Sequence, residues 1–194
     1  MPLLPAELQV YPHSLFDARE DLEAGDERWW VVHTRARAEK ALARRCLKSG
    51  TSYFLPQFEK KWRQGGRVLC SYRPLFSGYV FVFGNDEARC NVLATNLAAC
   101  VLRVEDQGQL HRDLQQVYRV MQEGKSLAPE DRLQPGSPVE IAYGPFAGME
   151  GKVIFRNKMR FVVEVRFLQQ GVSVDMEGWM LRRSDAPASA CLIA

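Results

Sequence analysis

The chain has 194 residues, of which 46% are hydrophobic and 25% charged, the balance of an ordinary globular protein. No apolar segment approaches the roughly 18 residues of a membrane span, and the first residues lack the pattern of a signal peptide. The five cysteines show neither CxxC nor Cys/His spacing, which argues against a disulfide framework or a zinc site. We therefore expect a cytoplasmic protein without cofactor, metal or membrane contact.

The charge is distributed unevenly along the chain. Residues 1–27 have a net charge of −6 and residues 28–73 a net charge of +10, although the whole chain has only +3. The acidic segment contains three prolines and no sustained hydrophobic period. Residues 1–27 are therefore predicted to be a poorly ordered acidic extension.

The first regular elements are predicted in the basic segment. The run RWWVVHT, residues 28–34, is typical of a strand. Residues 35–50 place apolar side chains at helical spacing, with Gly50 as the C-terminal stop. Basic side chains recur every three or four residues on this predicted helix, and the stripe consists of Arg37, Lys40, Arg44 and Lys48.

Strands and a hairpin are predicted from Thr51 to Phe83. Gly65 and Gly66 separate two apolar runs and indicate a hairpin turn with a basic tip. The stretch PLFSGYVFV, residues 74–82, is apolar at both odd and even positions, so as a strand it is apolar on both faces. Either both faces are buried, or one face is kept for a partner.

Helical and strand patterns alternate again after residue 83. A short helix is predicted with Asp86 as its N-cap, followed by a strand and turn over residues 100–110 and a third helix that ends near Gly124. Residues 28–124 are therefore predicted to form an α+β domain, a sandwich of helices on a mostly antiparallel sheet.

A second domain is predicted after a short linker. Residues 125–134 lose the hydrophobic period and gain proline, which indicates the linker. Residues 135–185 contain five short strand patterns separated by glycine turns, which favours a small β-barrel. Residues 186–194 are predicted to be a tail.

No catalytic pattern stands out in this sequence. The three histidines are scattered, and neither a P-loop nor a GxGxxG motif is present. We therefore identify no catalytic residue and expect a protein that is not an enzyme. A hydrolase or transferase with an unrecognised site stays an alternative, because catalytic groups assemble in space rather than in sequence.

Two motifs carry a resemblance to a known family. The strand WWVVHT, the basic helix and PLFSGYVFV together resemble the N-terminal domain of the NusG/RfaH family of transcription elongation and antitermination factors. The segment VEIAYGPFAGMEGKV, residues 139–153, resembles a KOW motif, which implies an SH3-like barrel. The resemblance covers residues 28–185, and the acidic extension and short linker favour a specialised paralogue over the general factor.

The resemblance implies a polymerase-binding surface. In this family the strand that matches PLFSGYVFV contributes to an apolar groove for the clamp helices of the RNA polymerase β′ subunit. The matching positions here are Phe76, Tyr79, Phe81, Val31 and His33. A helical partner would explain a strand that is apolar on both faces.

The resemblance also implies contact with upstream or non-template DNA near the basic helix. The candidate residues are Arg35, Arg37, Lys40, Arg44 and Arg45. Few aromatic residues lie among these cations, so phosphate contacts are expected rather than base reading.

Two further contacts follow from the same resemblance. Arg89, Cys90 and Asn91 occupy the position from which a relative touches the gate loop of the polymerase β subunit. Phe167 and Leu168 are the candidates in the KOW domain for binding a small-subunit ribosomal protein or Rho. The expected protein is a monomeric elongation or antitermination factor, and the alternative is a KOW-type RNA-binding or ribosome-binding protein.

Overall fold

The computed structural model describes residues 7–17, 25–123, 127–130, 137–141, 147–156, 158–175 and 181–183. The chain divides into two compact units, residues 1–115 and residues 116–194. Among the helices in the described residues, none combines the length and apolarity needed to cross a membrane.

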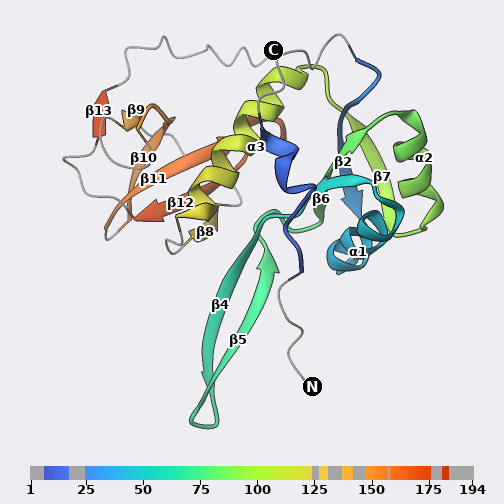
Figure 1. Cartoon of the computed structure of the whole chain (residues 1–194). Coiled ribbons are helices and arrows are strands. Elements are labelled where there is room, and N and C mark those ends of the chain that lie inside the picture. Colours follow the sequence, from blue (N-terminus) through green and yellow to red (C-terminus); the bar gives the residue numbers. More distant parts are fainter. Residues whose placement is uncertain are drawn as a thin grey trace, which may run out of the picture. The chain divides into compact units, whose positions relative to one another are not determined.

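Unit 1 is built on a five-stranded sheet in which every neighbouring pair is antiparallel. The order is β1-β3-β6-β2-β7, where the strands are β1 (Val10–Tyr11), β2 (Arg28–Thr34), β3 (Ser52–Phe54), β6 (Tyr79–Gly84) and β7 (Ala98–Arg103). A separate two-stranded hairpin is formed by β4 (Gln57–Gln64) and β5 (Arg67–Pro74). Figure 1 shows this hairpin extending away from the sheet.

Helices lie on both sides of this sheet, so the predicted α+β class is confirmed. The helices are α1 (Glu39–Ser49), α2 (Asp86–Ala94), α3 (Gln107–Gln122) and the short 3-10 helix η1 (His13–Phe16). Figure 1 shows α1 and α2 on one side of β2 and β6 and α3 on the other. The N-cap of α2 is Asn85 rather than Asp86, because the Asn85 side chain accepts a hydrogen bond from Ala88 N at 3.0 Å.

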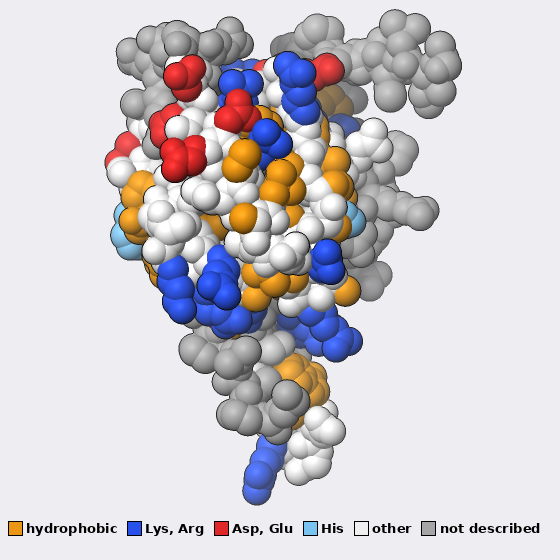
Figure 2. Space-filling view, turned by 90° about the vertical axis from the view of Figure 1, so that its right-hand side faces the viewer, with side chains coloured by type: hydrophobic (Ala, Val, Ile, Leu, Met, Phe, Trp, Pro, Cys, Tyr) orange, Lys and Arg blue, Asp and Glu red, His pale blue; other side chains and the backbone are white. Residues whose placement is uncertain are grey.

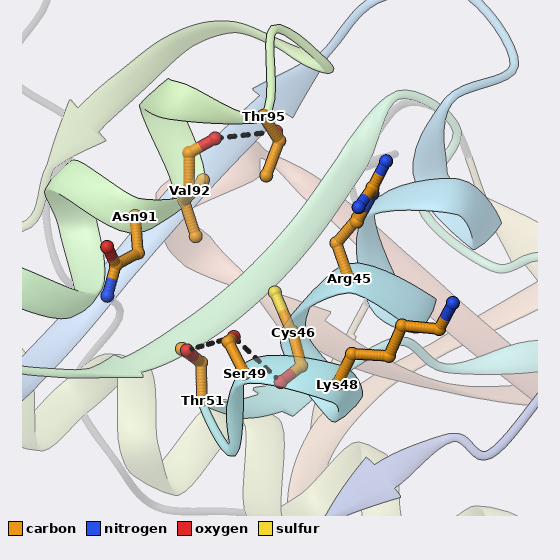
Figure 3. A pocket seen from close by; sticks show the side chains of 8 residues that line it. All are labelled: Arg45, Cys46, Lys48, Ser49, Thr51, Asn91, Val92 and Thr95. Carbon is orange, nitrogen blue, oxygen red and sulfur yellow. Dashed lines mark hydrogen bonds between the residues drawn. The ribbon is translucent and has the colours of Figure 1, made fainter.

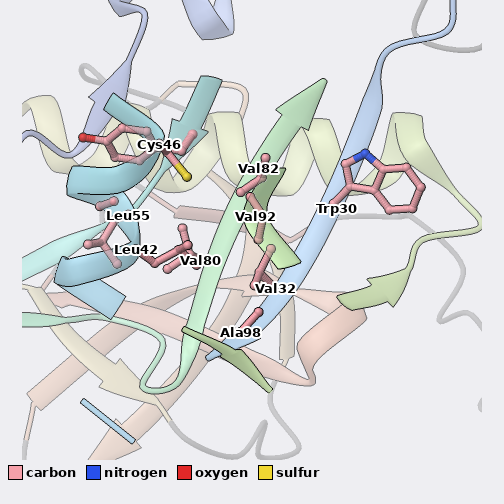
Figure 4. Close-up of a cluster of buried hydrophobic side chains, with 11 residues drawn as sticks. Trp30, Val32, Leu42, Cys46, Leu55, Val80, Val82, Val92 and Ala98 are labelled. Atoms are coloured by element: carbon pink, nitrogen blue, oxygen red, sulfur yellow. The ribbon is translucent and has the colours of Figure 1, made fainter. Parts of the chain in front are cut away.

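One face of the sheet packs against α1 and α2. Trp30 and Val32 of β2 and Val80 and Val82 of β6 alternate with residues that point to the opposite face. Figure 4 shows these side chains meeting the apolar side of α1 and Val92 of α2. Of the apolar residues at helical spacing in residues 35–50, Ala38, Leu42 and Cys46 are buried, whereas Ala41 is half-buried. Ala43, which the spacing did not include, is buried as well.

The opposite face, here called the aromatic face, is packed with rings. Trp29 is fully buried and its ring lies 5.2 Å from that of Phe83 and 5.9 Å from that of Phe16. Trp29 Nε1 donates a hydrogen bond to His111 Nδ1 of α3 at 3.2 Å. The first part of α3 and η1 thus cover the Trp29 end of this face.

Part of the acidic extension is folded, contrary to the prediction. Residues 10–11 form β1 on the edge of the sheet beside β3, and Leu15 and Phe16 of η1 are buried. The Phe16 ring meets that of Phe54 edge-on at 4.9 Å. The reason is that three large apolar side chains, Val10, Leu15 and Phe16, find a sheet edge and an apolar face, and each contributes about 1.5–3 kcal/mol when buried.

The stretch PLFSGYVFV is not one continuous strand. Pro74 ends β5, Tyr79 begins β6, and residues 75–78 form a bend and turn between them. Gly78 has a φ of 85°, a conformation that glycine adopts without strain. The strand itself is buried on both faces from residue 80 to residue 83.

Unit 2 contains a six-stranded antiparallel sheet in the order β13-β9-β10-β11-β12-β8. The elements are β8 (Leu127–Glu130), β9 (Ser137–Ile141), β10 (Glu150–Arg156), β11 (Lys158–Val165), the 3-10 helix η2 (Arg166–Leu168), β12 (Gln170–Asp175) and β13 (Leu181–Arg183). The β8 strand lies within residues 125–134, the predicted linker, and the bounds of the linker stay a prediction. Its Pro129 is compatible with pairing because β8 is an edge strand. Closure of this sheet into a KOW barrel stays a prediction.

Candidate functional site

The aromatic face ends in a group of side chains that the rest of unit 1 does not bury. His33 of β2 and Tyr79 of β6 lie directly opposite each other, with ring centroids 5.1 Å apart. His33 is exposed and Tyr79 is half-buried. On the next strand, β7, Cys100 is exposed and Leu102 is half-buried. We call His33, Tyr79, Cys100 and Leu102 the open end of the aromatic face.

Register places these four side chains on one face. Cys100 lies opposite His33 in the β2–β7 ladder, and Leu102 lies opposite Val31. Directly opposite residues of an antiparallel pair project to the same side of a sheet. Sequence reasoning missed Cys100 and Leu102 because the run AACVLR gives no indication of which β2 residues it faces.

The turn before Tyr79 is fixed from two sides. Gly78 N donates a hydrogen bond to Glu39 Oε1 of α1 at 2.8 Å, and Gly78 O accepts from Thr34 N at 2.7 Å. A Cβ at position 78 would lie 3.5 Å from the His33 ring. The turn therefore holds Tyr79 beside His33 and leaves room for the imidazole.

Three of the predicted polymerase-binding residues are buried. The exposed fractions are 0% for Val31, 1% for Phe76 and 0% for Phe81. The Phe76 and Phe81 rings meet edge-on at 5.7 Å, and Phe81 also faces Phe54 at 6.3 Å. The Phe76 and Phe81 rings thus pack in the core of unit 1, and the part that they play in polymerase binding stays a prediction.

The predicted basic residues do not form one helical stripe. Arg35 and Arg37 precede α1, and Arg37 has a φ of 61°, outside the helical region. Arg44 pairs with Glu7 of the acidic extension at 2.7 Å, while Lys40 is half-buried. Even so, Lys and Arg side chains gather on the lower part of the face shown in Figure 2. Of the basic side chains on α1 or just before it, the exposed ones that form no ion pair among the described residues are Arg35, Arg37, Arg45 and Lys48.

A pocket of about 340 Å³ lies between α1 and α2 on this side. Figure 3 shows its lining, which combines two cations with polar side chains and a buried thiol: Arg45, Lys48, Cys46, Ser49, Thr51, Asn91, Val92 and Thr95. Ser49 Oγ donates to Cys46 O at 3.1 Å and lies 2.8 Å from Thr51 Oγ1. Burial raises the pKa of the Cys46 thiol to about 12, so this group is neutral. The pocket therefore favours an anion or the polar edge of a base.

The three candidates for the gate-loop contact point in different directions. Neighbouring helical residues do not share a face, so Arg89 and Asn91 lie on different sides of α2. The Arg89 guanidinium lies 5.4 Å from the centroid of the Trp30 ring and 3.0 Å from Asp86. Asn91 lines the pocket, and Cys90 is exposed.

Phe167 and Leu168 lie in η2, the turn between β11 and β12. The exposed fraction of Phe167 is 38%, and Leu168 is half-buried. The pair thus lies in the turn between two strands of unit 2, and its role in partner binding stays a prediction.

No metal centre is formed by the residues that the structure describes. Within the described ranges, no three His, Cys, Asp or Glu side chains are grouped so that they could hold an ion. His111, one of the three histidines, is buried and accepts the Trp29 hydrogen bond.

Comparison with known proteins identifies the first domain. No curated protein matches the chain. The family model "Transcription termination factor nusG" matches residues 27–129, which is more than half of the chain and includes every element from β2 to α3. Members of this family are transcription factors that bind RNA polymerase. The chain therefore belongs to the NusG family.

Proposed function

We propose that this chain binds RNA polymerase through the open end of the aromatic face and grips the clamp helices of the β′ subunit. The observation that carries the proposal is the His33–Tyr79 pair at the open end of the aromatic face, where His33 is exposed and Tyr79 is half-buried. A helical partner docks through apolar and aromatic anchors set in a groove. Tyr79 supplies an anchor, and Cys100 and Leu102 supply the neighbouring surface.

The buried rings have a supporting role in this proposal. Phe76 and Phe81 pack beneath the open end and fix the backbone from which Tyr79 projects. An interface side chain held in one conformation loses less entropy on binding. Val31 acts in the same way beside Leu102, which lies directly opposite it on β7.

Clamp binding would promote processive elongation and antitermination. A ligand stabilises whichever of two conformations it binds more tightly. A protein that grips the clamp helices in the closed state therefore disfavours clamp opening, and the polymerase stays on its template.

A pulldown with purified RNA polymerase tests the proposal. Tyr79→Ala should weaken binding about 30-fold, the equivalent of roughly 2 kcal/mol for an aromatic hot spot. His33→Ala should weaken binding by less, and the matched controls Tyr72→Ala and His13→Ala should retain it. Unchanged retention of Tyr79→Ala, or no retention of the wild type, would contradict the proposal. Phe81→Ala is unsuitable here, because emptying a buried site destabilises the fold by about 3–5 kcal/mol.

We propose that the basic side of α1 contacts upstream or non-template DNA. Arg35, Arg37 and Arg45 are exposed, and Arg45 shares the pocket with Lys48. Two cations beside hydroxyl and amide groups suit a phosphate with its base or sugar. Exposed Cys90 on α2 is the remaining candidate for the gate loop.

We propose that Phe167 and Leu168 bind a protein partner, a small-subunit ribosomal protein or Rho. The exposure of a large aromatic side chain in the η2 turn supports this proposal. Phe167→Ser should abolish capture of that partner while polymerase binding is retained. We also propose that the chain is a specialised paralogue rather than the general factor. Genome-wide mapping of the tagged protein tests this, and we expect the protein at one locus rather than at most genes.

A further inference from the structure

The β4–β5 hairpin has two faces of different chemistry. Its register pairs Trp62 with Leu69, Lys60 with Ser71, and Phe58 with Arg73. Opposite residues share a face and alternate residues switch faces. One face, here called the tryptophan face, therefore consists of Phe58, Lys60, Trp62, Gln64, Arg67, Leu69, Ser71 and Arg73.

Aromatic rings alternate with cations along the tryptophan face. Lys60 separates Phe58 from Trp62, whose Cα atoms lie about 14 Å apart along a strand with a rise of about 3.4 Å per residue. Phe58 and Trp62 are both partly exposed, whereas Lys60, Arg67 and Arg73 are exposed. Among the described residues, these three cations have no recorded acidic partner. Their charge is therefore available to a ligand.

The opposite face of the hairpin is partly neutralised. Lys61 Nζ forms an ion pair with Glu59 Oε2 at 2.9 Å, and the Cys70 thiol donates to Glu59 Oε1 at 2.9 Å. The Cys70 hydrogen bond and the Lys61 ion pair lower the pKa of Glu59, so this carboxylate stays charged. On this face Arg63 is exposed and outside any ion pair among the described residues, and Tyr72 is half-buried. The tryptophan face has three such cations and two rings, so it is the stronger candidate for the binding side.

The β4–β5 hairpin projects from the five-stranded sheet of unit 1 (Figure 1). Gly65 and Gly66 both have positive φ, 56° and 76°, which is the backbone of a tight type I′ turn. β4 and β5 pair with each other as a separate sheet. Figure 2 shows the hairpin below the rest of unit 1 with basic side chains at its end.

We propose that the tryptophan face binds single-stranded DNA, with bases stacked on Trp62 and Phe58 and phosphates held by Lys60, Arg67 and Arg73. Stacking needs an unpaired base with a free ring face, which a duplex does not offer, and cations between the rings follow the backbone. Only the choice of DNA over RNA rests on the proposed function, because a transcribing polymerase displaces a DNA strand. The stacking itself follows from the hairpin alone.

Binding of the full chain to a fluorescein-labelled oligothymidine of 15 nucleotides tests the inference without polymerase. Trp62→Ala should weaken binding between about fivefold and a hundredfold, the range for loss of one stacked base. The matched control Tyr72→Ala, on the opposite face, should bind as the wild type does. Trp62→Phe keeps a ring and should retain most of the affinity.

The salt dependence separates the two faces. The double variant Lys60→Gln, Arg73→Gln should have a shallower dependence of the binding constant on salt. The slope of log binding constant against log salt concentration should fall in magnitude by about 1.4, since each phosphate contact on a single strand contributes about 0.7. Lys61→Gln, which removes a cation already paired with Glu59, should change the slope less. Circular dichroism and polymerase pulldown of each variant separate a loss of fold from a loss of the binding face.

Three results would overturn the inference. They are equal affinity of the wild type and Trp62→Ala for oligothymidine, duplex binding as tight as single-strand binding, and tighter binding to the RNA of the same sequence. Failure of the polymerase pulldown with intact oligothymidine binding would contradict the proposed function and leave this inference standing.

Discussion

Glu39 Oε1 accepts a hydrogen bond from Gly78 N at 2.8 Å, which ties the first turn of α1 to the turn that precedes Tyr79. The Glu39 side chain is buried, where a polar group needs a hydrogen-bond partner, and Gly78 N supplies one. Through this hydrogen bond, α1 helps to set the position of Tyr79 at the open end of the aromatic face.

Removal of the Glu39 carboxylate should destabilise unit 1. Glu39→Ala leaves the Gly78 N–H without its partner, so the free energy of unfolding should fall by about 1–3 kcal/mol. Glu39→Gln keeps an acceptor and should lose less. Urea unfolding of the two variants measures the difference, and equal losses would show that the hydrogen bond to Gly78 is not the cause.

Stability should fall at high pH because of Cys46. Burial raises the pKa of this thiol from its ordinary value of 9.0 to about 12 in the folded state. The folded state thus disfavours the thiolate, so the stabilisation is complete below pH 9 and is lost as the pH rises toward 12. Burial also raises the pKa of Tyr53 to about 12, which adds to the same loss.

Urea unfolding between pH 8 and pH 11 measures this dependence, with a slope of up to about 1.4 kcal/mol per pH unit for one group. Cys46→Ala should flatten the slope between pH 9 and pH 10. A slope that is identical in the variant would exclude Cys46 as its source.

A methyl group at Gly151 should disrupt unit 2. A Cβ at this position would clash with Val162 O and lie 2.6 Å from Phe161 Cζ, and backbone atoms cannot move aside cheaply. Gly151→Ala should therefore cost about 2 kcal/mol or more. Hydrogen exchange should show lost protection in β10 to β12 and unchanged protection in β2 and β6. The control Gly25→Ala should be neutral, because a Cβ there would lie 3.8 Å from its nearest neighbour, Glu27 N.

Neighbouring arginines on α1 should differ in their effect on DNA binding. Arg44 is paired with Glu7, whereas Arg45 lines the pocket with Lys48. Arg45→Gln should weaken binding to duplex DNA and lower the log–log salt slope by about 0.9, and Arg44→Gln should change both less. Fluorescence anisotropy at several salt concentrations measures both slopes, and a larger effect from Arg44→Gln would contradict the proposed contact.

Local patterns in the sequence were sufficient for much of unit 1. The run from Trp29 to Val32 predicted a strand, the spacing of Leu42 and Cys46 predicted the buried side of a helix, and Gly65–Gly66 predicted the hairpin turn. Each depends on a repeat of two or 3.6 residues, or on the φ angles open to glycine, so neighbours in the chain carry the information.

The candidate site depended on contacts between distant segments. Strand register brings Cys100 beside His33, packing buries Phe81 while Tyr79 stays at the surface, and the Phe16 side chain finds its place only against Phe54 and Trp29. No local period encodes these pairs. The sequence by itself determined the α+β elements and the basic segment, whereas tertiary structure decided which residues of PLFSGYVFV stay at the surface, because burial is a property of the assembled sheet and its covering helices.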